Sequence, residues 1–600
     1  MKGKILNIIT ILLLLANTSC DNYLTELNPN YKEESEYWKN LQEVNRGLSA
    51  VYASLRNSAV LNIREEAFRS DMAWPGAGRP IPESQGDEYN CYVHNYNNSS
   101  IFIKNKWEAC YAGIFRANQV IRALNRLKPT LDSKDGEKWR TLMGQARFFR
   151  GLYHFYLHSA FNKGNIILID EIPLRLEDFH KPLSSSEEVM KFFREDLRYA
   201  YENLPVSYSD AGDLGRITSG AAATILGTSY LYEFSDTKDD NTLDMAMDLF
   251  RYVIYDCGYE LVQNPDELFN EDYELNSESI LEIVYSEDIR PEMGDWDPNN
   301  FIQHLAFYTT QWNSGHLLPA WLANAYQTEK IDEKDPRNHF VQKTVNPDGT
   351  ITETDAVRKI SLRASSMVAV WEDVYTPWYL KPNVAEANIN FQMSTNGFGY
   401  YKKFSDCKTK DKDEQKSGMN IVINRLSEVY LMYAECLIEK GDVNEALKYI
   451  NEVRKRWGLV LLGQPFDADR TYDGLPYDAK TLMTHLREVE KPLELSLEGH
   501  MTRWIDLRRW GMLESNFKKL SEAVYYAVNP SVITPEGKSI NMHVTKFGVV
   551  RNAAEIKAHP QEYRLIDFEY DKPYQMFDYE RHAYYPIPMS EIEKNPNIKQ

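Results

Sequence analysis

Apolar residues recur three and four positions apart through most of the first 261 residues. This spacing places them on one face of a helix. The clearest runs lie within residues 44–55, 107–121 and 148–156, and similar patterns predict helices over Ser186–Leu204, Ser219–Phe234 and Leu243–Asp256. Because the connections between these segments are short, pairs of antiparallel helices are the simplest arrangement.

The helical spacing weakens between Val262 and Asn420, where Pro, Gly, Asn and Asp are frequent. Only Ser279–Tyr285 has the composition of a strand in this region. Five tryptophans lie here as well: Trp296, Trp312, Trp321, Trp371 and Trp378. Long loops in a compact protein are usually functional or disordered, and the aromatic content argues against disorder. We therefore predict a loop-rich functional region with few short strands.

Helical patterning returns over Asn424–Trp457, and part of it resembles a tetratricopeptide repeat. Small residues at Ala434 and Ala446 would allow two helices to pack closely. Gly441 would end the first helix in a left-handed conformation. A second hairpin of the same shape is predicted from Trp107–Leu127 and Lys138–His158. The chain is therefore predicted to be mainly α-helical.

The N-terminus reads as a secretion signal. Two lysines precede an apolar run from Ile5 to Leu15, which is too short to cross a bilayer as a helix, and Cys20 follows small residues. This pattern resembles the lipobox of bacterial lipoproteins; the alternative is an ordinary signal peptide with an incidental cysteine. We predict a signal peptide at 1–19, a lipidated tether at 20–36 and one unit at 37–600. Its parts are an N-terminal helical part at 37–261, a loop-rich aromatic insert at 262–420 and a C-terminal helical part with a tail at 421–600.

The formal net charge of −20 becomes −22 when the two signal lysines are removed. An acidic surface repels phosphate backbones, which disfavours a nucleic-acid role. It also disfavours strongly sulfated or other polyanionic ligands, unless a local basic patch overrides the mean. The five cysteines after Cys20 are widely spaced, so buried free thiols are expected.

Several motifs occur in an order that resembles the SusD/RagB family of outer-membrane lipoproteins of Bacteroidetes. They cover most of the mature chain and include Trp107-x3-Tyr111 with Asn118, Gln145–Tyr153, Gly215–Ala222, Asp335-Pro336-Arg337, Glu428–Glu435, Arg503-Trp504 with Asp506–Trp510, and Tyr585–Pro588. The resemblance implies a SusD-like fold with tetratricopeptide-like hairpins, held by lipid at the cell outer membrane and facing the exterior. It also implies a partner, a SusC-like TonB-dependent transporter, and a captured nutrient, commonly a glycan.

No motif of the chain indicates catalysis, so we expect no enzyme activity, no cofactor and no metal. His154 and His158 have the spacing of two metal ligands, but no third ligand is evident, and hydrogen-bonded histidines are the simpler interpretation. Charged residues between Glu498 and Arg509 are expected to form ion pairs within one helix.

Tryptophans in loops are the candidates for ligand binding. A sugar ring has an apolar face and a rim of hydroxyls, so its site requires a flat aromatic platform beside polar groups. Most tryptophans are largely buried, and Trp107 and Trp504 are expected in the core. The predicted ligand-binding residues are Trp74, Trp296, Trp312, Trp371, Trp378 and Asp71.

The sequence thus predicts a glycan-binding surface lipoprotein that delivers an oligosaccharide or polysaccharide to its transporter. Three alternatives remain open. They are the same transport role for a non-glycan nutrient such as peptide, a tetratricopeptide scaffold lipoprotein, and a surface glycosidase.

Overall fold

A computed structural model describes most of the chain after the N-terminal segment. The described residues are 38–75, 86–173, 175–286, 318–379, 381–386, 398–405, 417–465, 467–528, 531–541, 548–550, 563–564 and 570–598. Cys20, Trp296 and Trp312 lie outside them. Among the described residues, no helix has both the length and the apolar character needed to span a membrane.

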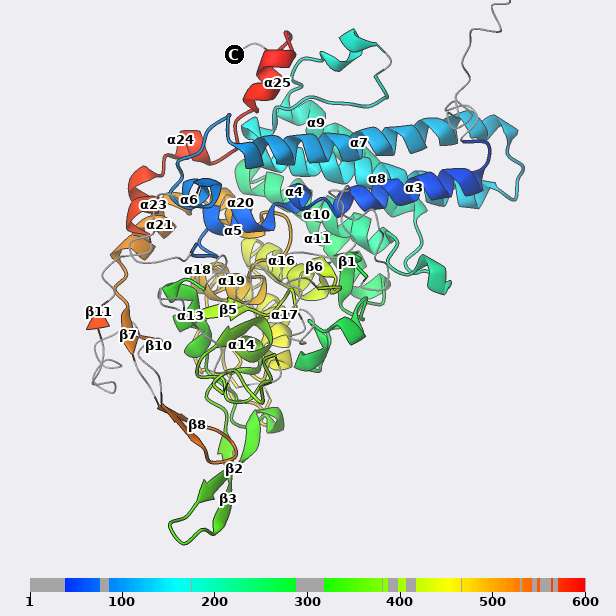
Figure 1. Cartoon of the computed structure of the whole chain (residues 1–600). Coiled ribbons are helices and arrows are strands. Elements are labelled where there is room, and N and C mark those ends of the chain that lie inside the picture. Colours follow the sequence, from blue (N-terminus) through cyan, green and yellow to red (C-terminus); the bar gives the residue numbers. More distant parts are fainter. Residues whose placement is uncertain are drawn as a thin grey trace, which may run out of the picture.

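Long helices form one end of the molecule (Figure 1). They are α3 (Leu41–Leu55), α7 (Ile101–Leu127), α8 (Gly136–Ala160) and α9 (Ser186–Asn203). Local sequence defines their ends: the Asn40 side chain accepts from the backbone of Glu43, and Ser185 and Glu188 form a capping box at the start of α9. The shorter helices α4 (Ser58–Leu61), α5 (Ile63–Arg69) and α6 (Gly86–Tyr92) lie between α3 and α7 in sequence.

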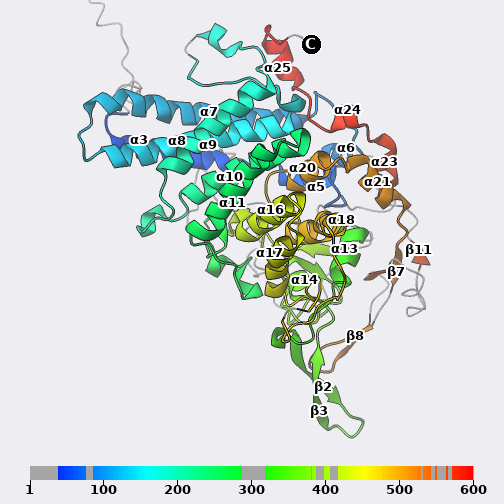
Figure 2. The ribbon, with the colours of Figure 1, turned by 180° about the vertical axis from the view of Figure 1, so that it is seen from behind.

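The helical array continues through α10 (Ser219–Thr237), α11 (Asp240–Asp256), α16 (Leu426–Glu439) and α17 (Val443–Arg456). Helix α11 packs on α16, although about 170 residues separate them in sequence; Figure 2 shows this side of the molecule. The predicted hairpin is confirmed by α16 and α17, with Ala434 and Ala446 fully buried and Gly441 at φ +84°. The second hairpin, α7 with α8, is confirmed as well.

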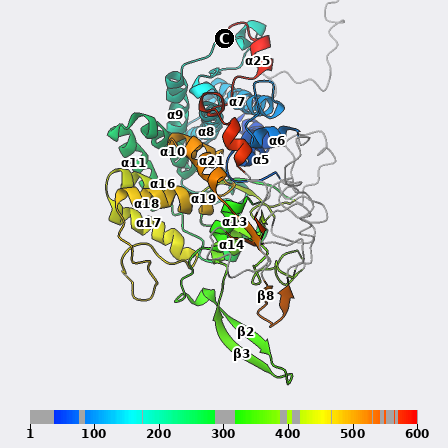
Figure 3. The ribbon, with the colours of Figure 1, turned by 90° about the vertical axis from the view of Figure 1, so that its left-hand side faces the viewer.

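The loop-rich region contains more regular structure than its sequence predicts. It holds the helices α13 (Ala320–Gln327) and α14 (Leu362–Met367) and the strands β1 (Ser279–Ile283), β2 (His339–Val345), β3 (Ile351–Val357), β4 (Val368–Val370) and β5 (Gly399–Tyr401). Strands β2 and β3 form an antiparallel hairpin that projects from the body (Figures 1 and 3). The other described strands also form small antiparallel sheets.

One of these small sheets corrects a predicted boundary. Strand β6 (Ile421–Arg425) pairs antiparallel with β1, with Ser279 opposite Arg425 and Ile283 opposite Ile421. Asn424 and Arg425 therefore belong to a strand, and the helix predicted from Asn424 begins at Leu426. The pairing ties the loop-rich region to the C-terminal helices.

The C-terminal part returns across the molecule to the N-terminal helices. It contains α18 (Ala479–His485), a π-helical turn at Leu486–Glu490, α19 (Lys491–Glu494), α20 (Thr502–Arg509), α21 (Leu513–Glu522), α23 (Asp571–Met576), α24 (Tyr579–His582) and α25 (Met589–Lys594). Short strands lie at β7 (Tyr526–Val528), β8 (Ser531–Ile533), β9 (Ser539–Asn541), β10 (Gly548–Val550) and β11 (Tyr563–Arg564). The Tyr585 hydroxyl donates to Glu66 on α5 (2.7 Å), and this bond joins the C-terminal part to the N-terminal helices.

The cysteines follow the sequence prediction as far as the structure describes them. Cys91, Cys110, Cys257 and Cys436 are buried free thiols, and Cys407 lies outside the described residues. Burial raises the pKa of Cys110 to about 12, so this thiol stays protonated and unreactive at neutral pH.

Candidate functional site

A cleft of about 580 Å³ lies within the loop-rich region. Its wall is assembled from separate segments, which include residues 264–270, the end of β3 with α14, residues 375–379 with Lys381, and Lys402 with Ser405. This volume is in the range of pockets that hold small organic ligands. The loop-rich region, which the sequence predicts to be functional, therefore contains the candidate site.

Aromatic side chains form part of the wall. Phe269, Tyr375 and Tyr379 line the cleft, and Asn264 and Asn270 place amide groups beside them. Tyr375 is half-buried, its ring packs edge-to-face on Phe340 (5.1 Å between centroids), and its hydroxyl accepts from the backbone N–H of Lys359 (3.0 Å). The hydroxyl is thus fixed, while the side chain as a whole stays partly exposed.

Tyr379 has an unusual backbone at this site. Its φ of 38° lies in the left-handed region, which bulky residues rarely adopt. Its hydroxyl donates to Ser405 across the cleft wall (2.9 Å). Backbone strain of this kind is typical of ligand-binding sites, where the surrounding structure holds a side chain in one position.

Charged groups complete the lining. Four cationic side chains and one carboxylate contribute: Arg337, Arg358, Lys381, Lys402 and Asp266. Arg337 forms an ion pair with Asp335 (2.6 Å), and these two residues belong to the Asp-Pro-Arg motif noted in the sequence. Burial raises the pKa of Asp335, but the neighbouring Arg337 and Arg470 outweigh this and hold it at about 2. The pair is therefore fully charged at neutral pH.

Three of the predicted tryptophans lie in the interior. Trp74, Trp371 and Trp378 are 0%, 2% and 1% exposed. Trp378 packs directly behind the cleft wall, 4.8 Å from the ring of Tyr379, and the Lys402 ammonium lies 5.9 Å from its centroid. In this conformation none of the three rings presents a face to a ligand, so a stacking role would require neighbouring chain to move. Their direct contact with ligand stays a prediction, as it does for Trp296 and Trp312 outside the described residues.

Asp71 occupies a structural position. Both of its carboxylate oxygens accept hydrogen bonds from Arg503 (2.8 and 2.7 Å), and one also accepts from Asn516 (2.9 Å). Its backbone carbonyl accepts from the indole N–H of Trp321 (2.7 Å). Asp71 is 0% exposed, so here it joins the N-terminal segment to α20 and α21 and makes no contact with solvent.

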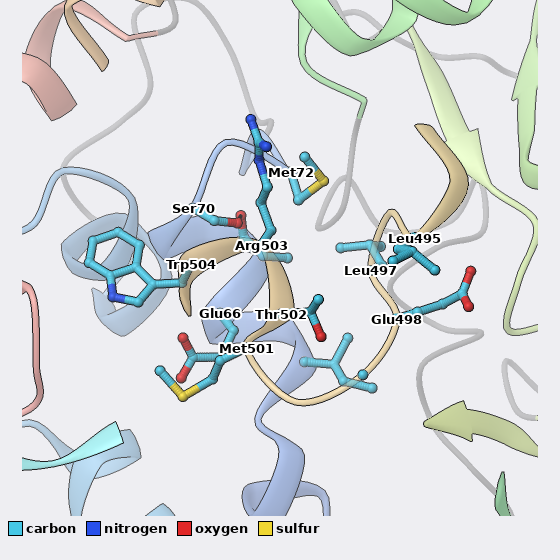
Figure 4. Close-up of a pocket in the computed structure, with 13 residues that line it drawn as sticks. Glu66, Ser70, Met72, Leu495, Leu497, Glu498, Met501, Thr502, Arg503 and Trp504 are labelled. Atoms are coloured by element: carbon cyan, nitrogen blue, oxygen red, sulfur yellow. Dashed lines mark hydrogen bonds between the residues drawn. The ribbon is translucent and has the colours of Figure 1, made fainter. Parts of the chain in front are cut away.

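Two smaller hollows lie elsewhere. One holds about 30 Å³ between α5 and residues 495–504, enough for one or two waters, and Figure 4 shows its lining side chains, among them Glu66, Met501 and Arg503. The other, of about 230 Å³, lies among α8, α9, α10, α20 and α24. Both are smaller than the cleft, which is the better candidate for an oligosaccharide.

The paired histidines are hydrogen-bonded, as predicted. His154 Nδ1 lies 2.8 Å from the carbonyl of Arg150, and His158 Nε2 lies 2.8 Å from the Ser186 hydroxyl. Burial lowers the pKa of His154 to about 4 and that of His158 to about 3, which keeps both neutral. Within the described part of the chain, no group of three or more His, Cys, Asp or Glu residues has the arrangement of a metal site.

Sequence reasoning missed the residues that line the cleft. Tyr375 and Tyr379 lie close to the predicted Trp378 in sequence, so the predicted segment contributes to the cleft wall through two tyrosines that were not predicted. The signal available was an aromatic run interrupted by Pro377. With 39 tyrosines in the chain, the sequence contained nothing that separates these two from the rest.

Solved structures place this architecture in a known fold. A SusD superfamily protein from Bacteroides vulgatus matches with a TM-score of 0.66 and 20% identity, over 94% of this chain and 99% of that one. A laminarin-binding SusD-like protein matches with a TM-score of 0.57 and 20% identity, over 93% and 98%. A structure with xylogluco-oligosaccharide matches with a TM-score of 0.59 and 18% identity, over 92% and 97%.

Sequence comparisons agree with the fold. SusD-like protein P25 of Formosa agariphila is 22% identical over 530 residues, which cover 85% of this chain and 90% of the relative. A family model described as "Starch-binding associating with outer membrane" matches residues 22–231. A second model, described as "SusD family", matches residues 277–600, more than half of the chain. With its mainly helical, SusD-like fold, the chain therefore belongs to the SusD family, as its motifs predict.

Proposed function

We propose that this protein is a cell-surface lipoprotein that binds a glycan and delivers it to a SusC-like TonB-dependent transporter, with no covalent chemistry. The observation that carries the proposal is a cleft with aromatic and amide lining in a chain of the SusD family. Two solved structures of the same fold support a saccharide ligand: one is described as a laminarin-binding SusD-like protein, and the other as a structure with xylogluco-oligosaccharide.

The chemistry of the cleft suits a saccharide. The half-buried rings of Phe269 and Tyr375 offer apolar surface to the C–H face of a sugar, while Asn264 and Asn270 offer donors and acceptors to its hydroxyls. A volume of about 580 Å³ accommodates a short stretch of a longer chain. Binding by stacking and hydrogen bonds alone would allow release to a transporter.

The test is affinity electrophoresis of the mature chain, with Cys20→Ala to remove the lipid site, in gels that contain plant, host or microbial polysaccharides. Tyr375→Ala should abolish retardation by the glycan that binds. Tyr255→Ala provides the matched control, because this tyrosine is 64% exposed on α11 and does not line the cleft. Retardation by no polysaccharide would favour a peptide or another nutrient.

Two further variants locate the aromatic platform. Trp296→Ala and Trp312→Ala should weaken retardation if the predicted tryptophans contact the same glycan. If both leave retardation unchanged while Tyr375→Ala abolishes it, the cleft alone carries binding. A glycosidase would release reducing ends from the retained polysaccharide, which we expect not to occur.

Attachment and partnership require separate tests. We expect radiolabelled fatty acid to be incorporated into the wild-type chain and not into Cys20→Ala, and surface proteolysis of intact cells to remove the protein. Purification from outer membranes should recover a TonB-dependent transporter with it. A soluble periplasmic protein that recovers no transporter would contradict this part of the proposal.

A further inference from the structure

Two cations at the cleft lack a carboxylate partner. Among the described residues, neither Arg358 nor Lys402 has an Asp or Glu oxygen within 4.0 Å of its charged nitrogens. Lys402 is only 7% exposed, and Arg358 is half-buried. Removing a charge from water without a counterion is costly, and proteins usually avoid it.

Most other buried cations of this chain are paired with a carboxylate; Arg508, whose guanidinium donates to the carbonyls of Ala583 and Ser159, is an exception. Lys403, the neighbour of Lys402, pairs with Glu498, and Arg363 pairs with Glu329 and with Glu490 (2.5 Å). These pairs belong to a buried network that reaches the back of the cleft wall, where the Lys403 ammonium lies 5.3 Å from the Phe269 ring centroid, but neither Lys403 nor Arg363 lines the cleft. Lys402 and Lys403 thus differ both in pairing and in location: Lys402, which lacks a carboxylate partner, lines the cleft, and Lys403, which is paired, does not.

Hydrogen bonds hold both unpaired cations in place. Arg358 donates to the Ser365 hydroxyl (2.6 Å) and to the carbonyl of Ile360 (3.2 Å). Lys402 donates to the carbonyl of Ser365 (2.8 Å) and to the hydroxyl of Thr376 (2.9 Å). A guanidinium has five N–H groups and an ammonium has three, so each retains donors beyond these bonds. The two cations are therefore anchored on one residue, Ser365, and retain capacity for a ligand.

The charge of the cleft is opposite to that of the protein. Four cations and one carboxylate line it, in a chain whose formal net charge is −20. The carboxylates that act on Arg358 at longer range are Asp373 and Asp266, and the oxygens of Asp373 accept from the backbone of Tyr375 and from Thr376. The cleft is therefore a local basic patch in a protein whose formal net charge is negative.

We infer that the cleft takes a saccharide carrying an anionic oxygen group, a uronate carboxylate or a sulfate ester, with Arg358 and Lys402 as its counterions. The inference rests on the proposed function and names the class of glycan. A guanidinium binds planar oxyanions through two parallel hydrogen bonds, and an ammonium adds a point charge beside it. Tyr375, whose ring lies 4.5 Å from the Arg358 guanidinium, would place the sugar face next to that charge.

The experiment offers each glycan to the mature Cys20→Ala chain in an acidic and a neutralised form. The probes are polygalacturonate and alginate with their methyl esters, and carrageenan with its desulfated product. We expect at least one acidic form to bind about tenfold more tightly than its neutral counterpart, with an affinity that falls as salt is raised. A preference for the acidic form in a methyl-ester pair identifies a carboxylate as the recognised group. A preference for carrageenan over its desulfated product identifies a sulfate ester.

Charge-removing variants assign the effect to the cleft. Arg358→Gln and Lys402→Gln should each weaken binding of the acidic form about tenfold, and weaken binding of its neutral counterpart by a smaller factor. Lys448→Gln makes the same charge change on α17, where the side chain is 70% exposed, and should have no effect. If Lys402→Gln lowers the melting temperature, the exposed Lys381→Gln at the same cleft replaces it.

The outcomes separate this inference from the proposed function. Equal binding of acidic and neutral forms, or acidic binding that Arg358→Gln does not weaken, overturns the inference and leaves glycan capture supported. Binding to no glycan of either charge counts against both.

Discussion

The bond between Asp71 and Arg503 gives the sharpest prediction, because it decides between a structural role and a ligand role for Asp71. Asp71→Asn removes the carboxylate charge and preserves the side-chain size. Arg503 then keeps its charge in a site where its side chain is 11% exposed, and its other acceptor among the described residues is the Arg487 carbonyl (3.1 Å). Breaking a buried ion pair from one side costs about 3–5 kcal/mol.

The expected thermal shift is small for a chain of this size. At about 2.1 cal/mol/K per residue, the unfolding entropy of about 560 residues is about 1.2 kcal/mol/K. A loss of about 3–5 kcal/mol therefore lowers the melting temperature by about 3–4 °C. Scanning calorimetry resolves a shift of this size, provided that the wild type and the variant unfold in one comparable transition.

The control is the double variant Asp71→Asn/Arg503→Met, which removes the stranded charge as well. It should recover part of the lost stability, because two neutral side chains leave no buried ion unpaired. A melting temperature within about 1 °C of wild type for Asp71→Asn, together with lost glycan binding, would refute the structural reasoning. That result would favour the sequence prediction that Asp71 contacts the ligand.

Three further predictions concern single sites. Burial raises the pKa of Glu428 to about 7, so the folded protein binds a proton at this carboxyl more tightly than the unfolded chain does. The stability that this group contributes therefore falls as pH rises from about 4.5 to 7. Glu428→Gln should raise the urea midpoint at pH 8 and leave it nearly unchanged at pH 4. Gly441→Ala should cost about 1–2 kcal/mol of unfolding free energy from backbone strain alone, since its φ is +84° and an added Cβ meets no atom within 4 Å; equal urea midpoints would contradict this. Gly113→Ala should lower the unfolding free energy by about 1–3 kcal/mol through overpacking, because the added Cβ would lie 2.3 Å from the Tyr153 ring. An unchanged urea midpoint would contradict this, since it would mean that α7 and α8 accommodate the methyl group without cost.

Sequence alone determined the main helices outside the loop-rich region and several of their ends. Capping residues such as Ser185 and Thr218 act on backbone N–H groups two or three residues away, and the structure shows both bonds. Gly441 likewise ends α16 through its own backbone conformation. These interactions span a few residues, so they can be inferred without knowing the rest of the fold.

The partners of charged side chains followed a different rule. The sequence suggested ion pairs within the helix that ends near Arg509, but among these residues the structure shows one such pair, Asp506 with Arg509 (2.8 Å). Glu498 instead pairs with Arg425 (2.6 Å), and Arg503 pairs with Asp71. Helical spacing identifies only the charged residues that could pair along one helix, whereas tertiary packing placed oppositely charged residues of other elements closer to them.

The cleft shows the same division. From the sequence came the loop-rich region and its aromatic content, and the family resemblance implied a captured nutrient, commonly a glycan. Only the tertiary structure turned Trp378 inward, brought Tyr375 to the wall and set Arg358 and Lys402 around Ser365. Backbone propensity is local and leaves a trace in the sequence, but the burial of a ring and the pairing of a charge depend on segments that meet only when the chain is folded.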